Sequence, residues 1–464
     1  MINVGASASD RMLTSTVSAG SAFVARALPA ATTAQGEAIT GDAMDAATVD
    51  PSRTGLQGSR GRFAGRWCWS SVDHARLKKK LNNAQRARAI GVAIYTNDNP
   101  LGAWDPGAAA KLPALMISNE DGKRLKDRLA GALQVTLQFK SAPFPQNQNV
   151  ISTFSSSGPT AGATIGIDMV AVGQNVYTAA ERTDSRGQVF NASGYISVNG
   201  TSYSSPMVAG AAAVLKAARP GLDLIHYKSL LVNTATAFAD GSNASVLRMG
   251  AGVLNVERAL RAKAAVSPVS VAFGAGGGTA DVTRTFQLSN LASVQDTFTI
   301  TAQPMGMLTA TPQVLTQTVT VPAGGSRQVS LRWAPTGLAP GGYQGFILVR
   351  GTASDIELRI PYWYAVTGSA PKFISLFRSG QAVRVASRST FYVRVGDAAG
   401  VAMMANAPVV QAVAGEGEVL SVTPSQLFPA CWLVEVKLGP VPGDNIFRVL
   451  AGEIGREYVM SAGS

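Results

Sequence analysis

Residues 199–210 read NGTSYSSPMVAG and run directly into a strongly apolar stretch. The spacing of the apolar residues predicts a helix over 207–218, with Pro206 at its start, where a missing backbone N–H costs little. Gly200 allows a tight turn just before this helix. Ser202 then lies at the amino end of a long apolar helix, where the partial positive charge of the backbone amides is greatest. Its hydroxyl is exposed in that position, and its own N–H can help to hold an oxyanion.

Two interpretations of this string are open. A Thr-Ser pair before a helix is common as an ordinary N-cap. The whole string, however, resembles the active-serine signature of the subtilisin-like serine peptidases, GTSx(S/A)xPxVAG. Its neighbours resemble the same family: TFSSSGPT and IDMVAVG before the serine, KAARPGLDLIHYKSLLVNTA and GAGVLNVERAL after it. The resemblance implies a serine endopeptidase in which Ser202 is the nucleophile and Gly200 and Thr201 support the oxyanion turn.

The partners of this serine are not found in the family's context. Subtilases take an aspartate from a D-TG strand end and a histidine from an HGT-VAG helix, and neither string is present. His74 and His226 lie outside such a context, so we expect surface or structural roles for both, and likewise for Asp168 at a strand end. The family's oxyanion asparagine precedes the VGAS strand with which this chain opens. Losing one or all members of a triad costs several orders of magnitude in rate, so we expect the chain to be inactive unless an upstream segment supplies the aspartate and histidine.

A small α/β unit is predicted before the serine. Apolar spacing indicates a helix from Leu77 to Ala87, and a second helix over 123–130 follows a capping stretch, Asn119 to Gly122. Short strands are expected between and after these helices, and residues 33–65 have the composition of a surface connection. FAGR, NAQRARAIGVAIYTN and LPALMISNEDGKRLKDRL resemble the protease-associated domain that many subtilases carry as an insertion.

After residue 265 the sequence consists of short β-rich runs separated by turn residues, a pattern that is typical of antiparallel sandwiches. The two blocks resemble a fibronectin-type-III-like and an immunoglobulin-like module. We therefore expect a multidomain chain whose incomplete α/β subtilisin-like domain, a parallel sheet with helices, comprises residues 1–50 and 141–262. The protease-associated insert is expected at 51–140, the fibronectin-type-III-like β-sandwich at 263–367 and the Ig-like β-sandwich at 368–464.

Composition excludes several classes of protein. Of the 464 residues, 46% are hydrophobic and 15% charged, which excludes disorder along most of the chain, and no apolar run is long enough to span a membrane. Two histidines and two distant cysteines are too few for a zinc enzyme. No ligand cluster or other cofactor site is identifiable, so structural calcium is implied only by the family resemblance.

The net charge of +12 has two interpretations, attraction to anionic partners or plain solubility. The basic run over 76–88 likewise fits either a polyanion site or a solvated helix face, and the absence of aromatic residues within it favours the second.

Two functions follow as hypotheses. One is a secreted or cell-surface serine endopeptidase acting on peptides or proteins, with export implied by the family although Met1 opens no secretory signal. The other is a non-catalytic, truncated subtilase that serves as a protein- or surface-binding multidomain protein. Nucleic acid is not a favoured partner in either case.

Overall fold

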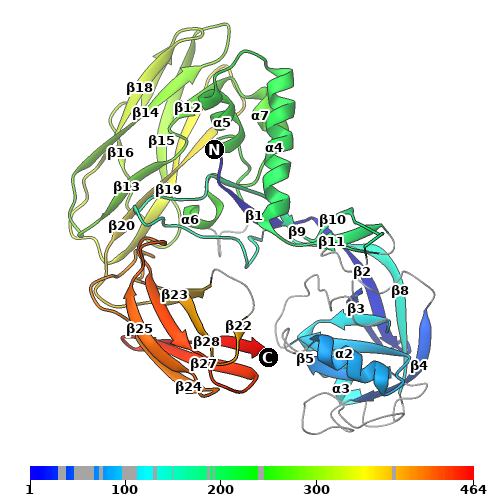
Figure 1. The fold of residues 1–464 in the computed structure, drawn as a ribbon. Coiled ribbons are helices and arrows are strands. Elements are labelled where there is room, and N and C mark those ends of the chain that lie inside the picture. Colours follow the sequence, from blue (N-terminus) through cyan, green and yellow to red (C-terminus); the bar gives the residue numbers. More distant parts are fainter. Residues whose placement is uncertain are drawn as a thin grey trace. The chain divides into compact units, whose positions relative to one another are not determined.

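The computed structural model of the chain describes residues 1–29, 38–45, 67–72, 77–96, 112–128, 133–148, 150–184, 189–191, 194–238, 245–378 and 383–463. They form two compact units (Figure 1). The barrel unit comprises Ala6–Phe154 and Val172–Ser204, and the module unit comprises Met1–Gly5, Ser155–Ala171 and Ser205–Ser464. Among the helices of this described part, none is long and apolar enough to cross a bilayer.

Seven strands of the barrel unit form a closed barrel. Their bounds are β2 (Arg11–Ala19), β3 (Phe23–Pro29), β4 (Ile39–Asp45), β5 (Trp67–Val72), β6 (Gly91–Thr96), β7 (Ala114–Ile117) and β8 (Leu133–Pro145). Around the barrel the order is β2-β3-β7-β6-β5-β4-β8. The pairs along β4-β5-β6-β7 are parallel and the other pairs antiparallel, so closure leaves no free edge among these strands.

This barrel corrects the expected domain boundary. The sequence predicts that residues 1–50 belong with the catalytic part and that the insert starts at residue 51. The structure instead pairs β2, β3 and β4 into the barrel, which runs from Arg11 to Pro145. Serine, threonine and alanine dominate β2, MLTSTVSA after its first residue, so its hydrophobic alternation is weak although its side chains are largely buried.

Two helices of the barrel unit lie against its strands, α2 (Leu77–Arg86) and α3 (Asn119–Arg128) (Figure 1). The predicted apolar face of α2 is confirmed, because Leu81 and Ala84 are buried in a common cluster with Met12 and Ile94. The barrel interior contains a second cluster around Phe23.

The start of α3 differs from the prediction. The stretch from Asn119 to Gly122 is helical, and the cap is Ser118, whose hydroxyl accepts a hydrogen bond from the Asp121 N–H at 3.1 Å. Ser118 Oγ also donates to Asp121 Oδ2 at 2.9 Å. The bond from the Asp121 N–H to the Ser118 hydroxyl is an N-cap, and the helix starts at Asn119, four residues ahead of Lys123.

Two short pairings occur where a larger parallel sheet is predicted. Strand β1 (Val4–Ala8) pairs with β9 (Met169–Gln174), and β10 (Val176–Ala179) forms an antiparallel hairpin with β11 (Tyr195–Val198). Within the described residues the parallel sheet expected for 1–50 and 141–262 is therefore reduced to one strand pair, because the strands after β1 pair into the barrel instead.

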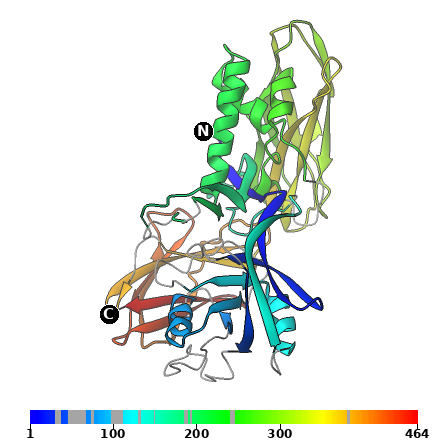
Figure 2. The ribbon, with the colours of Figure 1, turned by 90° about the vertical axis from the view of Figure 1, so that its right-hand side faces the viewer.

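The helices that follow belong chiefly to the module unit. Their bounds are α4 (Thr201–Ala218), α5 (Leu224–Val232), α6 (Val246–Met249) and α7 (Val256–Arg261). Val208, Ala211 and Leu215 of α4 are buried together with side chains of α5 and α7. Figures 1 and 2 show α5 and α7 between α4 and the strands that follow them in the chain.

The first module is formed by two sheets that share one core. Their strands are β12 (Ala264–Ser267), β13 (Val271–Gly276), β14 (Val282–Asn290), β15 (Asp296–Pro304), β16 (Gln313–Val314), β17 (Thr318–Val321), β18 (Ser326–Trp333), β19 (Gly341–Gly351) and β20 (Leu358–Val366). The orders are β12-β14-β18-β16 and β13-β20-β19-β15-β17. Their pairs are antiparallel except β13 with β20, so the antiparallel prediction is wrong at that pair. Trp333 lies fully buried in the core.

A buried polar network fastens α5 to this first module. The Ser229 hydroxyl accepts a hydrogen bond from Val266 N–H at 2.7 Å. The amide of Asn233 donates to the carbonyl oxygens of Val269 and Arg359 at 2.8 and 2.9 Å. Because buried hydrogen-bonded groups are costly to separate, the helices and the first module behave as one packed body.

The second module also consists of two sheets around one core. Its strands are β21 (Phe373–Phe377), β22 (Val383–Arg384), β23 (Arg388–Gly396), β24 (Val409–Ala414), β25 (Glu418–Pro424), β26 (Trp432–Lys437), β27 (Gly443–Ala451) and β28 (Ile454–Gly463). They pair in the orders β21-β23-β26-β25 and β22-β28-β27-β24. Phe391 and Phe447 lie in the core, one from each sheet.

Candidate active site

Ser202 is the second residue of α4 and is exposed. The first amides of a helix have no acceptor within it, so the Ser202 N–H is available at the positive end of an 18-residue helix. Within the described part of the chain, its hydroxyl makes no hydrogen bond. The site therefore presents a free hydroxyl and a free amide from the same residue.

The turn before Ser202 is held by hydrogen bonds within the barrel unit. Gly200 N–H donates to the Gly173 carbonyl at 2.7 Å. The Asn199 side-chain oxygen accepts from Asn175 N–H, also at 2.7 Å. These two bonds hold the turn against the end of β9, so the chain is fixed in the two residues that precede Thr201 and Ser202.

Two glycines make that close approach possible. Gly200 has φ +157°, a conformation that L residues with side chains rarely adopt. A Cβ on Gly173 would lie 2.1 Å from the Ser204 hydroxyl and 2.8 Å from the Gly200 carbonyl oxygen. Any side chain at position 173 would therefore push the turn away from β9.

Pro206 is not at the helix start, as the sequence predicts, but inside α4. The helix begins at Thr201, five residues earlier, because the turn is anchored upstream by Gly200 and Asn199. Proline has no N–H, and its partner four residues earlier in an α-helix is Ser202. The proline therefore leaves the Ser202 carbonyl oxygen without an intrahelical hydrogen-bond donor.

Ser204 shows the opposite environment to Ser202. Its side chain is fully buried against Gly173, and its hydroxyl has no hydrogen-bond partner among the described residues. The two serines, two positions apart in one helix, thus point one to solvent and one to the interior. Of these two serines, only Ser202 is exposed to solvent.

The other polar residues considered from sequence have separate places. His226 lies partly exposed in α5, within the module unit, and His74 lies outside the described residues. Asp168 is engaged structurally, since its carboxylate accepts from the Asn3 N–H at 2.8 Å and pairs with Lys228 at 3.1 Å. Among the described residues, no three acidic, histidine or cysteine side chains form a cluster that could hold a metal ion.

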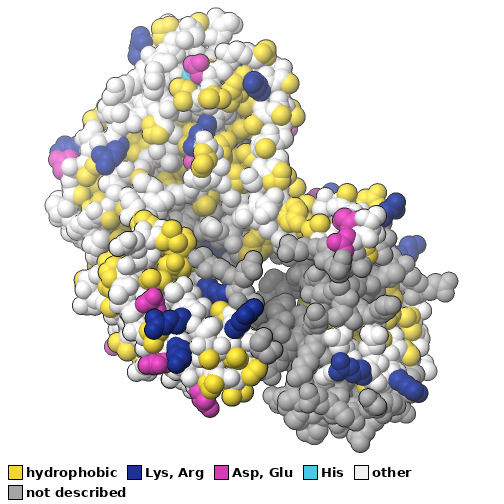
Figure 3. Space-filling model, in the orientation of Figure 1, with side chains coloured by type: hydrophobic (Ala, Val, Ile, Leu, Met, Phe, Trp, Pro, Cys, Tyr) yellow, Lys and Arg dark blue, Asp and Glu magenta, His cyan; other side chains and the backbone are white. Residues whose placement is uncertain are grey.

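An exposed aromatic pair lies on the hairpin that leads to the turn, and the sequence analysis missed it. Tyr177 of β10 and Tyr195 of β11 stack with ring centroids 5.6 Å apart and planes 16° apart. They are 48% and 54% exposed, and Figure 3 shows hydrophobic side chains over this hairpin. β11 ends at Val198, directly before the turn, so the pair is joined to Ser202 by a short stretch of chain. The two tyrosines are eighteen residues apart, so their contact cannot be predicted from the sequence before the register of the hairpin is known.

The loop within this hairpin contains an acidic residue with a perturbed pKa. The Glu181 side chain accepts hydrogen bonds from the hydroxyl and the N–H of Thr183 and, at 2.7 Å, from the N–H of Asp184. The hydrogen bonds from Thr183 are the main cause that lowers the pKa of Glu181. The carboxylate stabilises the loop through these hydrogen bonds.

The fold and the turn define a class of chain: one with an exposed serine at the amino end of a long, partly exposed helix, beside a free amide. Residues 64–258 match the model of the subtilase family, Peptidase_S8. This segment of the chain belongs to the subtilases, and the β-rich modules after it fit trailing domains of such proteins.

Individual relatives agree with this family. The chain is 30% identical over 281 residues to the minor extracellular protease Vpr of Bacillus subtilis, covering 58% of this chain and 34% of Vpr. It is 28% identical over 336 residues to the C5a peptidase of Streptococcus pyogenes serotype M1, covering 62% of this chain and 26% of that protein. The chain thus spans about a third or less of the length of these relatives.

Among solved structures, the chain is similar to the zinc aminopeptidase BSAP from Bacillus subtilis. The identity is 23%, the match covers 29% of this chain and 32% of that one, and the TM-score is 0.23. No functional conclusion follows from a superposition at this level.

Proposed function

We propose that this chain belongs to a subtilisin-type serine endopeptidase that cleaves peptide bonds through an acyl-enzyme on Ser202. The observation that carries the proposal is the exposed, unpartnered Ser202 hydroxyl at the amino end of α4. In the reaction, Ser202 Oγ attacks the substrate carbonyl carbon while a histidine accepts the hydroxyl proton. The Ser202 N–H donates to the oxyanion as the carbonyl carbon becomes tetrahedral, and Thr201 and Gly200 hold that amide in place.

The aspartate and the histidine are proposed to come from a segment outside this chain. Neither family motif occurs in the sequence, and His226 lies in α5 rather than near the turn in the chain. Without a proton acceptor the hydroxyl is a weak nucleophile, so the chain alone is proposed to be inactive. Collapse of the tetrahedral intermediate needs the same histidine as the donor to the leaving amine, so both halves of the reaction depend on that segment.

An exposed apolar face on α4 supports such a partner. Met207 and Val214 of this helix are 38% and 50% exposed, and Figure 3 shows hydrophobic side chains along it. A long helix with apolar side chains both on its buried side and on its exposed side is typical of a helix that packs against a second partner on the exposed side. We infer that the segment bringing the histidine covers this face.

The substrate is proposed to be an extended peptide that contacts the Tyr177 and Tyr195 rings beside the turn. Stacked tyrosines that are half exposed offer a large rigid apolar surface at small entropic cost. The proposed location is extracellular or at the cell surface, since the relative Vpr of Bacillus subtilis is an extracellular protease.

The remaining parts of the chain are assigned by resemblance. We propose that the barrel from Arg11 to Pro145 is the protease-associated insert, and that the first and second modules are the fibronectin-type-III-like and Ig-like β-sandwiches. Their role is proposed to be the handling of substrate or partners, with no part in bond cleavage.

A non-catalytic function is the alternative. The observation that favours it is the same free hydroxyl, since no base reaches it within the described part of the chain. In that case the chain binds a protein or a surface through its barrel and its two modules. Hydrolysis would then be absent under every condition.

Casein hydrolysis distinguishes the two. The purified chain is assayed alone and together with the polypeptide encoded directly before the Met1 codon, each with Ser202→Ala and with Ser205→Ala as matched control. Ser205 is an exposed serine of the same helix turn. The endopeptidase proposal expects hydrolysis only in the mixture, lost on Ser202→Ala and retained on Ser205→Ala. No hydrolysis in any mixture favours the binding protein.

A further inference from the structure

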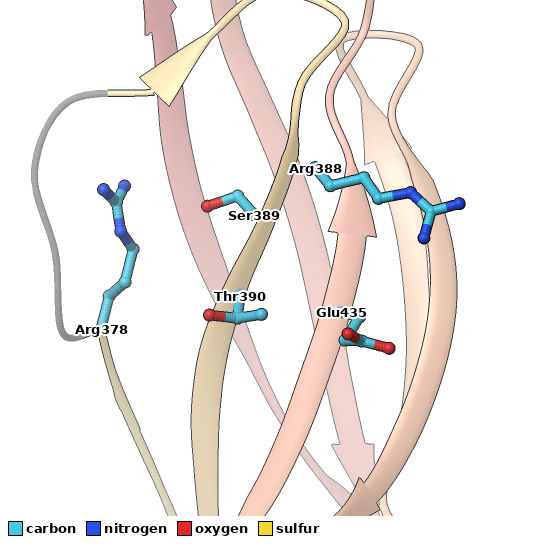
Figure 4. Close-up of a pocket in the computed structure, with 5 residues that line it drawn as sticks. All are labelled: Arg378, Arg388, Ser389, Thr390 and Glu435. Atoms are coloured by element: carbon cyan, nitrogen blue, oxygen red, sulfur yellow. The ribbon is translucent and has the colours of Figure 1, made fainter.

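A hollow of about 300 Å³ opens on the second module, in a part of the chain that shares no residue with the Ser202 turn. Its lining side chains are Arg378, Arg388, Ser389, Thr390 and Glu435 (Figure 4). They combine two guanidinium groups, two hydroxyls and one carboxylate, so the hollow is polar and carries a net positive charge. Small-ligand pockets begin at about this volume.

The backbone holds Arg378 in place beside β23. Arg378 directly follows β21, whose last residue, Phe377, is paired with Tyr392 of β23. The rings of Phe377 and Tyr392 stack at 5.3 Å, and Phe428 packs edge-on against both, at 5.2 and 4.6 Å. A packed aromatic cluster therefore fixes the chain one residue before the guanidinium, and Ser389 lies three residues before Tyr392 on the same strand.

The donors around the hollow are unused within the described residues. Arg378 and Arg388 form no ion pair or hydrogen bond there, and the hydroxyls of Ser389 and Thr390 have no partner either. Other arginines of the module are engaged. Arg394 donates to the Pro159 carbonyl at 2.9 Å, and Arg448 pairs with Glu457 at 2.7 Å. Free donors collected at one hollow indicate a place for an acceptor.

The carboxylate of Glu435 does not occupy that place. Its oxygen accepts from the Ser421 hydroxyl at 2.6 Å, toward β25. In Figure 4 it points away from Arg378, whereas the hydroxyls of Ser389 and Thr390 point to the side on which Arg378 lies. A ligand on that side meets a cation and two hydroxyls without a competing carboxylate.

We propose that this hollow binds one oxyanion group, a carboxylate, sulfate or phosphate, through the Arg378 guanidinium and the hydroxyls of Ser389 and Thr390. A guanidinium presents paired N–H groups that match two oxygens of such a group, and charge-assisted bonds of this kind are about twice as strong as neutral ones. Arg388 adds attraction from the other side of β23. The site makes the second module a binding module for a small anionic group, whether or not Ser202 is catalytic.

A second observation agrees with a positive potential at this end of the module. Burial raises the pKa of the Tyr458 hydroxyl, and the charge of Arg378 acts in the opposite sense on it. The guanidinium is therefore close enough to Tyr458 of β28 to bias a neighbouring acid toward its anionic form.

Calorimetric titration of the intact chain with sodium phosphate, sodium sulfate and sodium acetate, at pH 7 and constant ionic strength, tests the site. Saturable binding of at least one probe is expected, and the probe that binds identifies the chemistry of the natural group. Arg378→Gln is expected to weaken binding by about tenfold or more, because it removes a charged bidentate donor. The double variant Ser389→Ala/Thr390→Val is expected to weaken it less.

Arg384→Gln is the matched control, because Arg384 is an exposed arginine of the same module outside the hollow. It is expected to bind within about twofold of the unchanged chain, since a distant charge contributes only screened attraction. Thermal unfolding of each variant shows that the module remains folded. Absence of saturable binding by the unchanged chain, or an equal loss in Arg384→Gln, would overturn the proposal. Ser202→Ala should bind as the unchanged chain does, which separates this site from the proposed activity.

Discussion

Asp296 in the first module and Ser202 in the active-site turn are opposite cases of a polar side chain in this molecule. Asp296 is buried, and its Oδ1 accepts from Thr297 N–H, from the N–H and hydroxyl of Thr352 and from Ala353 N–H, at 2.6 to 3.1 Å. Ser202 is exposed, and its hydroxyl bonds to nothing within the described part of the chain. The first is a polar group used to hold a fold together, and the second is left free for a ligand.

This difference separates the residues that stabilise the fold from the residue that is proposed to react. All the hydrogen-bond donors to this buried carboxylate come from the first module itself, so its charge needs no partner from another part of the chain. The turn before Ser202 is held by hydrogen bonds of the Gly200 backbone and the Asn199 side chain, and the Ser202 hydroxyl takes no part in them. Substitutions in the core of the first module should therefore lower the free energy of unfolding, whereas replacement of the Ser202 hydroxyl should lower only the rate of the proposed reaction.

The largest effect on stability is expected from removing a large side chain at the centre of the first module's core. Trp333 is fully buried, with four aromatic rings at centroid distances of 5.2 to 6.3 Å. Trp333→Ala should destabilise the module by about 3–5 kcal/mol, because it leaves a cavity that the rings cannot fill. Differential scanning calorimetry measures it, with Val294→Ala, an exposed site, as the control. A loss under about 1 kcal/mol would mean that the core is not organised around this ring.

The next effect concerns the turn itself. Gly173→Ala should cost about 1–3 kcal/mol, because its Cβ would collide with the Ser204 hydroxyl and the Gly200 carbonyl. Gly210→Ala, inside α4 with open space around its Cβ, should stabilise by about 0.5–1 kcal/mol. Thermal unfolding compares the two variants. Equal unfolding temperatures for the two variants would contradict the close contact between the turn and β9.

A smaller effect sharpens the account of Asp296. Burial alone would raise the pKa of this carboxyl, but the hydrogen bonds from Thr352, Ala353 and Thr297 outweigh it and lower the pKa. The resulting stability is fully present above the unfolded pKa of about 3.9 and is lost as the pH falls through the folded pKa. Asp296→Asn keeps the acceptor oxygen and removes the charge, so it should cost about 1 kcal/mol at pH 7.

The pH dependence provides the check on that change. Because the side-chain amide introduced by Asp296→Asn cannot titrate, the difference in unfolding midpoint between the two proteins should narrow between pH 7 and pH 3. A difference that is constant over this range would show that the charge of Asp296 contributes nothing.

The smallest effect is expected at an exposed carboxylate of the same module. Asp281 pairs with Arg332 on the surface, and the hydrogen bond from Arg332 lowers the pKa of Asp281. Solvent and salt screen such a pair, so Asp281→Asn should leave the unfolding midpoint unchanged within error at 0.15 M salt, about physiological strength. Calorimetry beside Asp296→Asn gives the comparison. A shift as large as that of Asp296→Asn would contradict the contrast between buried and exposed charge.

The sequence predicts the helix that carries Ser202 better than it predicts the strands around that helix. The string around Ser202 predicts the helix correctly, because glycine, proline and the apolar run each limit the local backbone, and the role of Ser202 as nucleophile stays a prediction. It places the helix start at Pro206, five residues late, because the anchor is a contact between Asn199 and Asn175 that no local pattern reveals. The close packing of Gly173 is equally invisible before β9 and the turn are brought together.

The barrel shows where local patterns fail. Helix α2 is predicted well because leucine and alanine recur at helical spacing. Strand β2, rich in serine and threonine, has buried or partly buried side chains after Arg11 although its sequence is largely polar. Long-range pairing with β3 and β8 decides its structure, and a single sequence does not contain that pairing.

Covalent labelling of Ser202 tests the central claim most directly. A fluorophosphonate probe is added to the chain alone, to its mixture with the polypeptide encoded before Met1, and to the same mixtures with Ser202→Ala or Ser205→Ala, and the labelled peptide is mapped by mass spectrometry. The account predicts labelling of Ser202 in the mixture, none with Ser202→Ala, full labelling of Ser202 with Ser205→Ala, and little with the chain alone. A mixture in which Ser202 stays unlabelled while another residue reacts would contradict it.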